Sequence, residues 1–243
     1  MDLKDTLRTQ WTEAAQDWIG QDQAVRTGML DSWMLDALGN VRGKRALDIG
    51  CGEGRFSRLL AGLGAEVTGI DLTEPLIERA RSLAVGGDSY VMGDAETLDG
   101  IADENFDLAV SYIVLVDLLD YRASIEAAYR VLKPGGRFIV CNVHPMRSAV
   151  PYGWVNLAGR KLFYAVDDYW DEGPREFPWW DKNFVNMHRT LSSYVKAFLD
   201  AGFVLEGLAE PVPSEEQLVE NPSFDDEFRA PNFVVFGLRK PAV

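Results

Sequence analysis

Residues that commonly bind metal ions are scarce in this sequence. It contains two cysteines, Cys51 and Cys141, and two histidines, His144 and His188. The members of each pair lie far apart, and neither pair has the spacing of a metal site. We therefore expect the protein to bind no metal ion. We also expect Cys51 to be a small residue beside a ligand rather than a nucleophile.

Long apolar segments are absent as well. No run of about 18 apolar residues occurs, so we expect no membrane-spanning helix. The first residues, Met1–Asp5, include two acids and no apolar signal region. The sequence therefore predicts a cytoplasmic protein.

Basic residues are outnumbered by acidic ones. Lysine and arginine total 24, aspartate and glutamate total 38, and the formal net charge is −14. Such a field repels the phosphate backbone of nucleic acids, and no basic cluster along the chain offsets it. We expect no nucleic-acid partner, and only a local basic groove would overturn this expectation.

The chain does contain enough apolar residues for one substantial core. Of its 243 residues, 47% are hydrophobic and 26% are charged, which is typical of globular proteins. Because α/β chains of this length commonly form one unit, we predict a single domain over residues 1–243. Nothing in the sequence indicates an oligomeric state.

The most informative stretch is a short apolar run followed by a glycine turn and a helix. Residues 46–49 have the pattern of a strand buried on both faces. Gly50, Gly52 and Gly54 follow, and the apolar residues after them recur at helical spacing. Glycines allow close approach of the backbone, and the first helical turn offers free N–H groups. This arrangement predicts a cradle for a small ligand.

The spacing around the turn indicates which ligand it holds. A dinucleotide fingerprint needs glycine at the position of Arg55, so the match to that fingerprint is incomplete. Asp48 ends the first strand, where it could hold the turn or receive an ammonium group. Asp71 ends the next strand, at the distance where an acid meets ribose hydroxyls. Together these features favour an adenosine-containing ligand.

A third acid strengthens this interpretation. Residues 89–92 form a short third strand, and Asp94 follows it. The carboxyl ends of parallel strands meet at one edge of a sheet, so Asp48, Asp71 and Asp94 are predicted to converge on one crevice.

At this point the chain resembles the class I S-adenosylmethionine-dependent methyltransferases. The likeness rests on motifs that occur in the family's order between about residues 41 and 141: Asp48-x-Gly50-x-Gly52-x-Gly54, Gly69-Ile70-Asp71, Gly93-Asp94-Ala95-Glu96, the strand Phe106–Ser111, and the turn Val131–Gly136. The pattern Ser111-Tyr112-x-x-Leu115-x-Asp117 is similar to small-molecule members of the ubiquinone and menaquinone biosynthesis type.

The resemblance implies S-adenosyl-L-methionine as cofactor and a small-molecule acceptor. It implies that Asp71 binds the ribose hydroxyls, that Asp94 and Ala95 meet the adenine, and that the Gly50–Gly52 backbone holds the methionine portion. The complete set of predicted cofactor-binding residues is Trp18, Asp48, Gly50, Cys51, Gly52, Asp71, Leu72, Asp94, Ala95, Glu96, Ser111 and Tyr112. Ser111 and Tyr112 are placed near the transferred methyl group.

The periodicity beyond the motifs completes the predicted fold. Strands and helices alternate over residues 41–143, the cofactor-binding core, and a helix over 191–199 opens the final segment, 191–243. Two strands, 203–208 and 232–238, follow an acidic loop over 211–231, and we expect them to pair antiparallel. We predict a Rossmann-like seven-stranded mixed sheet with an antiparallel last strand, reversed at the sheet edge, and helices on both faces.

Two further segments are predicted to surround the ligand. Residues 5–38 have helical periodicity, and the resemblance implies that the N-terminal segment 1–40 is a lid; simple packing of Trp11 and Trp18 is the alternative. The insertion 144–190 lacks helical or strand periodicity and is rich in aromatic residues: Tyr152, Trp154, Phe163, Tyr164, Tyr169, Trp170, Phe177, Trp179, Trp180 and Phe184. We interpret it as a substrate cap, the alternative being a self-contained apolar cluster.

Methyl transfer from a sulfonium is an in-line displacement, for which the protein supplies alignment and a dry site. We expect methylation of oxygen or nitrogen rather than carbon. If the acceptor arrives protonated, His144 and His188 are the candidate bases, with structural hydrogen bonding as the alternative, and Tyr112 and Asp117 are weaker candidates.

Two other functions are compatible with parts of the sequence. One is a cofactor-binding protein of methyltransferase fold with a regulatory or partner role. The other is a nucleotide-dependent oxidoreductase, which Arg55 and the terminal strand pair disfavour.

Overall fold

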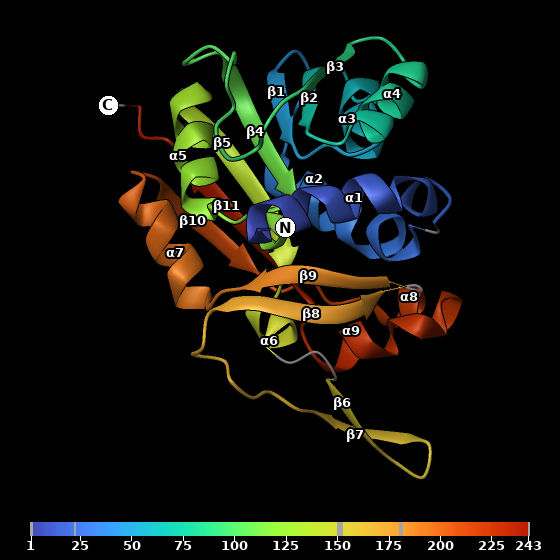
Figure 1. Cartoon of the computed structure of the whole chain (residues 1–243). Helices are drawn as coiled ribbons and strands as arrows, with labels where there is room; N and C mark the ends of the chain where they lie inside the picture. The colour runs from blue at the N-terminus through green and yellow to red at the C-terminus, as the bar shows by residue number, and fades with distance from the viewer. Residues whose placement is uncertain (1, 22, 150–152, 180–181, 243) are drawn as a thin grey trace.

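A seven-stranded sheet runs through the computed structural model (Figure 1), which describes residues 2–21, 23–149, 153–179 and 182–242. The strand order is β10-β11-β5-β4-β1-β2-β3. The strands are β1 (Arg45–Ile49), β2 (Glu66–Asp71), β3 (Asp88–Met92), β4 (Phe106–Tyr112), β5 (Leu132–Val143), β10 (Val204–Ala209) and β11 (Phe233–Arg239).

The direction of the strands confirms the predicted mixed sheet, with one correction. Neighbouring strands from β5 to β3 run parallel, and β11 runs antiparallel to both β5 and β10. The reversed strand therefore lies between β10 and β5, whereas the sequence placed it at the edge. β5 also begins at Leu132, within the predicted turn Val131–Gly136, because Leu132 already pairs with Phe106 of β4.

Helices cover both faces of the sheet because side chains along each strand alternate between two apolar layers. Leu47 and Ile49 pack in the layer beneath α5 (Tyr121–Val131) and α7 (Leu191–Asp200), whereas Ala46 packs in the opposite layer. That second layer contains α2 (Asp31–Leu38) and α3 (Arg55–Gly62), and α4 (Glu74–Ser82) packs beside β3.

The N-terminal segment is helical, as predicted for residues 5–38, and it is divided into separate helices. Helix α1 (Leu3–Ile19) starts at Asp2, whose side chain accepts a hydrogen bond from the Asp5 N–H, and it ends at Gly20. A π-helical turn, Arg26–Leu30, then leads directly into α2. In Figure 1, α1 lies across the carboxyl ends of the central strands, the edge at which the three acids are predicted to converge.

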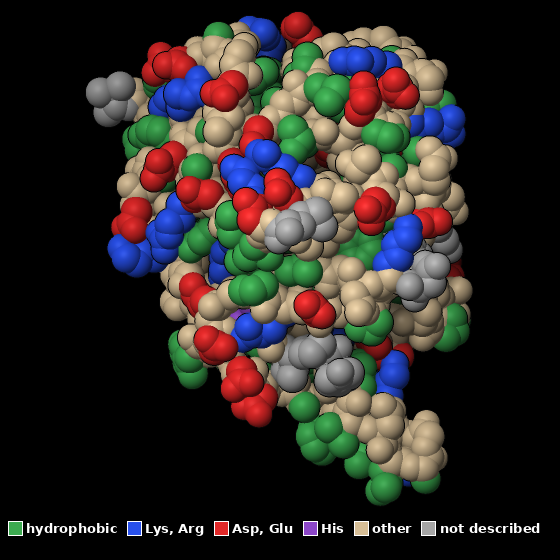
Figure 2. Space-filling view, in the orientation of Figure 1, with side chains coloured by type: hydrophobic (Ala, Val, Ile, Leu, Met, Phe, Trp, Pro, Cys, Tyr) green, Lys and Arg blue, Asp and Glu red, His purple; other side chains and the backbone are tan. Residues whose placement is uncertain are grey.

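The insertion after β5 is more regular than predicted. After the short helix α6 (Pro145–Ser148) it forms two hairpins, β6 (Trp154–Leu157) with β7 (Arg160–Tyr164), and β8 (Gly173–Trp179) with β9 (Lys182–His188). The β8–β9 hairpin lies beside α1, whereas β6–β7 projects from the body and carries exposed apolar side chains (Figures 1 and 2). Tyr152 and Trp180 lie outside the described residues.

The acidic segment 211–231, predicted as a loop, also contains helices. These are α8 (Glu215–Glu220), a 3-10 turn (Pro222–Phe224) and α9 (Asp225–Arg229). Ser214 and Gln217 form a reciprocal capping box at the start of α8, which fixes its first turn. Within the described ranges, every helix is too short or too polar to cross a lipid bilayer.

Candidate functional site

The three acids predicted at successive strand ends line a single cavity. Asp48, Asp71 and Asp94 surround it together with the glycine turn after β1 and the inner side of α1. Of the residues predicted to bind the cofactor, those lining this cofactor cavity are Trp18, Asp48, Gly50, Cys51, Gly52, Asp71, Leu72, Asp94, Ala95, Glu96 and Tyr112. Ser111 is fully buried in β4 and does not line it.

The backbone conformation of the glycine turn is one that residues with a β-carbon could not adopt without strain or a clash. Gly50 has φ of 69°, and a β-carbon there would lie 2.5 Å from a methyl carbon of Val114. The N–H groups of Gly50 and Cys51 both donate to the Ile70 carbonyl, at 2.8 and 3.0 Å. The turn is thereby fixed to the end of β2, with its backbone against the cavity.

Asp71 is held by the backbone on both sides. Its Oδ2 accepts from the Gly52 N–H at 2.9 Å, and its Oδ1 accepts from the Thr73 N–H at 2.8 Å. Burial raises the pKa of this carboxyl, while these N–H groups oppose the rise. The Thr73 hydroxyl and the Leu72 N–H also lower the pKa of this carboxyl. A carboxylate oxygen can accept more than one hydrogen bond, so Asp71 can also bind a ligand hydroxyl in the cavity that it lines.

Asp48 is the most deeply buried of the three acids. It is 1% exposed, and its Oδ2 accepts from the Ser57 hydroxyl at 2.6 Å. Burial raises the pKa of Asp48 to about 6, although the Ser57 hydrogen bond lowers it. A buried carboxyl in this state gains from a cationic ligand group, which would stabilise its ionised form.

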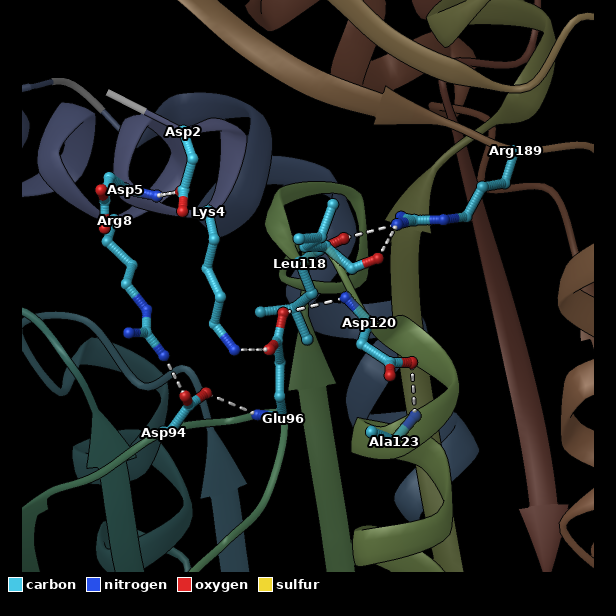
Figure 3. A network of polar contacts seen from close by, with 11 residues as sticks. Asp2, Lys4, Asp5, Arg8, Asp94, Glu96, Leu118, Asp120, Ala123 and Arg189 are labelled. Atoms are coloured by element: carbon cyan, nitrogen blue, oxygen red, sulfur yellow. Dashed lines mark hydrogen bonds and ion pairs between the residues drawn. The ribbon is translucent and has the colours of Figure 1, made fainter.

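The third acid is engaged by α1. Figure 3 shows Arg8 reaching Asp94, and Lys4 reaching Glu96 at 2.6 Å between Nζ and Oε2. Although burial opposes ionisation, the Asp120 N–H and the Lys4 ammonium hold the pKa of Glu96 below its usual value. Two ion pairs therefore hold α1 over this end of the cavity.

Tyr112 lines the cofactor cavity and takes part in a network of polar contacts. Its hydroxyl donates to Asp31 Oδ1 at 3.0 Å, and Arg55 binds both oxygens of Asp31, at 2.6 and 2.9 Å. Arg55, which breaks the dinucleotide fingerprint, thus joins the start of α3 to the start of α2.

Arg26 is a cavity residue that the sequence did not identify. Its guanidinium carbon lies 4.5 Å from the centre of the Trp18 ring and 5.3 Å from that of Tyr112. Burial lowers the pKa of this guanidinium, and no described residue accepts a hydrogen bond from it. Arg26 is half-buried at the cavity surface, and Asp117 is a carboxylate near enough to interact with its charge. Its guanidinium donors can therefore pair with an anionic ligand group in the cavity.

Comparison with known proteins agrees with this geometry. A family model described as "Methyltransferase domain" matches residues 47–140. The crystal structure of an S-adenosylmethionine-dependent methyltransferase from Mesorhizobium loti is 32% identical, with a TM-score of 0.79 over 86% of this chain and 96% of that one. The chain belongs to the class I S-adenosylmethionine-dependent methyltransferases.

Curated relatives cover the chain less completely. A Haemophilus influenzae protein of uncharacterized activity is 28% identical over 81% of this chain and 79% of its own length. The malonyl-[acyl-carrier protein] O-methyltransferase of Pseudescherichia vulneris is 37% identical, and the match spans 51% of this chain and about half of that enzyme, 47%. Family membership identifies the cofactor of this methyltransferase as S-adenosylmethionine, and the glycine cradle, Asp48 and Arg26 suit its charged methionyl end.

A second cavity of about 470 Å³ adjoins the cofactor cavity of the methyltransferase. The two share a wall made of Trp11, Trp18, Gln23, Arg26, Ile113 and Asp117. The outer side of this second cavity, here called the acceptor cavity, is formed by the insertion, through Tyr164, Arg175, Phe177, Trp179, Phe184 and Asn186. The cap residues thus face a space beside the cofactor cavity.

Two residues of the shared wall are unusual, Ile113 in its backbone conformation and Asp117 in its pKa. Ile113 has φ of 61°, a left-handed conformation that is strained for a β-branched residue. Asp117 accepts a hydrogen bond from the Asn186 amide at 2.8 Å. Burial raises the pKa of Asp117 to about 8, although Arg26 lowers it. Asp117 is therefore a carboxyl poised to exchange a proton near neutral pH.

The two histidines of the methyltransferase line neither cavity. His144 accepts a hydrogen bond from the Met146 N–H at Nδ1, and its Nε2 lies 3.0 Å from Glu210 Oε1. His188 is fully buried between the Ser148 hydroxyl, at 2.8 Å, and the Tyr169 carbonyl, at 2.9 Å. The structure thus does not bring the two predicted bases together with Asp48, Asp71 and Tyr112.

Proposed function

We propose that the protein transfers a methyl group from S-adenosylmethionine to an oxygen or nitrogen atom of a small molecule bound in the acceptor cavity. The observation that carries the proposal is the wall that the two cavities share. A donor in one cavity and an acceptor in the other would meet at this wall, as an in-line displacement requires.

The residues of the cofactor cavity supply a complementary partner for each polar part of the cofactor. We assign the ribose hydroxyls to Asp71, the methionyl ammonium to Asp48, and the methionyl carboxylate to Arg26. The backbone of Gly50 and Gly52 would lie along the methionine chain. The adenine would lie near Asp94, Ala95 and Glu96, beneath α1.

When bound, the cofactor supplies an electrophilic methyl group, and the acceptor supplies the electron pair. The protein contributes alignment and exclusion of water. Trp11 and Trp18 line both cavities, and their rings tolerate a cation while keeping the wall apolar. The products are S-adenosylhomocysteine and the methylated acceptor, which loses one proton if its nucleophile arrives protonated.

We assign that proton to Asp117. Its carboxyl lies in the shared wall, and its raised pKa suits it to accept a proton from a weakly acidic hydroxyl or amine. His144 and His188, proposed as bases from the sequence, act in this assignment as hydrogen-bonding residues outside the cavities.

The test is transfer of a labelled methyl group into a metabolite extract, with the product identified by mass spectrometry. We expect a labelled small molecule with the wild-type chain and none with Asp71→Asn. Tight binding of S-adenosylhomocysteine without any labelled product would instead support the regulatory alternative. Preferential binding of NAD would support the oxidoreductase alternative.

A further inference from the structure

The acceptor cavity is positively charged within an acidic protein. Among the described residues, its lining contains three arginines, Arg26, Arg147 and Arg175, and one carboxylate, Asp117. Asp117 has a raised pKa, so its negative charge is only partly developed at neutral pH. The whole chain carries a formal charge of −14. A cationic cavity on such a chain favours an anionic occupant.

Arg147 is directed by backbone groups and has no carboxylate partner among the described residues. Its Nη2 donates to the carbonyls of Asp226 and Ala230, at 2.8 and 3.0 Å, and its Nε donates to that of Pro231 at 3.3 Å. Its guanidinium carbon lies 4.3 Å from the centre of the Tyr164 ring. These contacts fix the side chain, and no backbone carbonyl or carboxylate of the described residues accepts a hydrogen bond from its Nη1.

Arg175, on β8, lines the same cavity. Its Nε donates to the carbonyl of Ala149, two residues after Arg147, at 3.4 Å. Its carboxylate partner is Asp171, at 3.5 Å, and the Asp171 side chain is 81% exposed. The Nη1 and Nη2 of Arg175 also donate to the carbonyls of Pro174 and Asp171, which are neutral. Water screens the ion pair, so no described carboxylate fully compensates the charge of Arg175.

From these contacts we propose that the acceptor is a planar aromatic acid whose carboxylate binds Arg147 and Arg175. Guanidinium groups pair with carboxylates through parallel hydrogen bonds, and Phe177, Trp179 and Phe233 line the same cavity with aromatic rings. The nucleophilic hydroxyl or amine then lies toward Asp117. This inference rests on the proposed function, and it specifies the substrate class.

Arg147 and Arg175 lie apart from Arg26, the residue that we assign to the carboxylate of the cofactor. Both line the acceptor cavity alone, whereas Arg26 lines both cavities. Removing Arg147 and Arg175 should therefore leave cofactor binding intact. This separation lets the experiment distinguish an anionic acceptor from an anionic cofactor end.

The experiment is calorimetric titration of the complex with S-adenosylhomocysteine, using three matched pairs of probes. The pairs are hydroxybenzoate and hydroxybenzamide, hydroxycinnamate and hydroxycinnamamide, and hydroxynaphthoate and hydroxynaphthamide. We expect at least one acid to bind roughly tenfold or more tightly than its neutral amide, because a bidentate ion pair replaces a neutral contact. In Arg147→Met/Arg175→Met this preference should fall to less than about threefold.

Three controls keep the result interpretable. Arg175→Met alone should lose part of the preference, which covers the case that the double variant unfolds. Arg79→Met, an exposed arginine on α4 outside both cavities, should keep all of it. Affinity for S-adenosylhomocysteine should be unchanged in every variant.

Equal binding of acids and amides, or no binding by any acid, would overturn the proposal. A preference for acids that survives in Arg175→Met and in the folded double variant would overturn it too. Since these measurements are equilibrium binding, they do not depend on turnover. A failure of the proposed function would appear separately, as absence of labelled product in the extract.

Discussion

The polar residues of the cofactor cavity have charges that the protein itself leaves incompletely compensated. Asp48 is buried with one hydroxyl partner, and Arg26 stacks on Trp18 without a hydrogen-bond acceptor among the described residues. A zwitterionic methionyl group would supply the missing partner to each. The two residues thus give the cavity a complementary pattern of charge before any ligand arrives.

The raised pKa of Asp48 predicts a pH dependence of cofactor affinity. Its carboxyl has a pKa of about 6 in the folded chain, against 3.8 for an ordinary aspartate. The ionised form pairs with the methionyl ammonium, so affinity for S-adenosylhomocysteine should rise with pH and be about tenfold weaker at pH 5 than at pH 7. Calorimetry across this range measures the effect.

The same pKa has the opposite consequence for the free protein. Between pH 3.8 and about 6 the folded chain holds the Asp48 proton more tightly than the unfolded chain does. The contribution of Asp48 to the free energy of unfolding therefore falls as pH rises through this window. Asp48→Asn should flatten both profiles, and an unchanged affinity profile in that variant would remove Asp48 from ammonium binding.

Asp117 provides the second prediction for a single residue. Asp117→Asn keeps the shape and an oxygen that can accept from Asn186, but it cannot take up a proton. We expect kcat to fall by about 100-fold or more while affinity for S-adenosylhomocysteine is retained. With the wild type, kcat/KM for the acceptor found in the extract should rise with pH and level off above about 8.

Asp103→Asn, an exposed residue, is the matched control and should behave as the wild type. A fully active Asp117→Asn would show that the nucleophile reacts without this base. In that case a rate that depends on His144 or His188 would restore the histidine assignment.

At the scale of elements, α1 lines both cavities, and the β8–β9 hairpin lines the acceptor cavity. The Gln10 amide exchanges two hydrogen bonds with the Val185 backbone, at 3.0 and 2.9 Å, joining α1 to β9. Trp11 packs edge-on against Trp18, Trp179 and Phe184, with ring centres 5.4 to 5.8 Å apart. We propose that α1 is a lid over the cofactor, held at the opposite side by its ion pairs to Asp94 and Glu96.

Weakening those ion pairs should loosen the lid. The Lys4 and Arg8 side chains are 39% and 42% exposed, so each pair contributes only about 0.2 to 1 kcal/mol. Lys4→Gln/Arg8→Gln should release S-adenosylhomocysteine about three- to tenfold faster, measured by stopped-flow fluorescence, and should speed hydrogen exchange in α1. Arg122→Gln, whose ion pair with Asp200 lies away from the cavity, is the control.

Unchanged release with unchanged exchange would show that α1 is fixed by its apolar contacts instead. Faster exchange without faster release would show that α1 does not retain the cofactor.

Elements with a clear local sequence pattern were predictable. The other elements were not, because their residue composition obscured the pattern. The buried runs before Gly50 and after Glu66 predicted β1 and β2 because strands in a parallel sheet are apolar on both faces. In β8 the half-buried residues Arg175, Phe177 and Trp179 alternate regularly, but prolines at the intervening positions hid the strand pattern. The helices of 211–231 were missed because their acidic residues show no apolar stripe.

At the scale of the molecule, the two cavities differ in how far their lining could be predicted from the sequence. The acids at the ends of β1, β2 and β3 were predictable because parallel strands place their carboxyl ends at one edge. Arg26 and Arg147 carry no motif, and only the folding of the N-terminal segment and the insertion over that edge brings them to the cavities. The lining of the cofactor cavity was therefore largely predictable from the sequence, whereas for the acceptor cavity the aromatic residues of the insertion were predicted and the arginines were not.

The most direct test of the whole account is calorimetric titration with S-adenosylhomocysteine of the wild type, Asp71→Asn and the exposed control Asp99→Asn. Asparagine at position 71 sets an amide group against the N–H of Gly52 or Thr73 and weakens the ribose contact. We predict one-to-one binding by the wild type and the control, and binding weaker by roughly tenfold or more in Asp71→Asn. Equal affinity in all three proteins, or no binding by the wild type, would contradict the account.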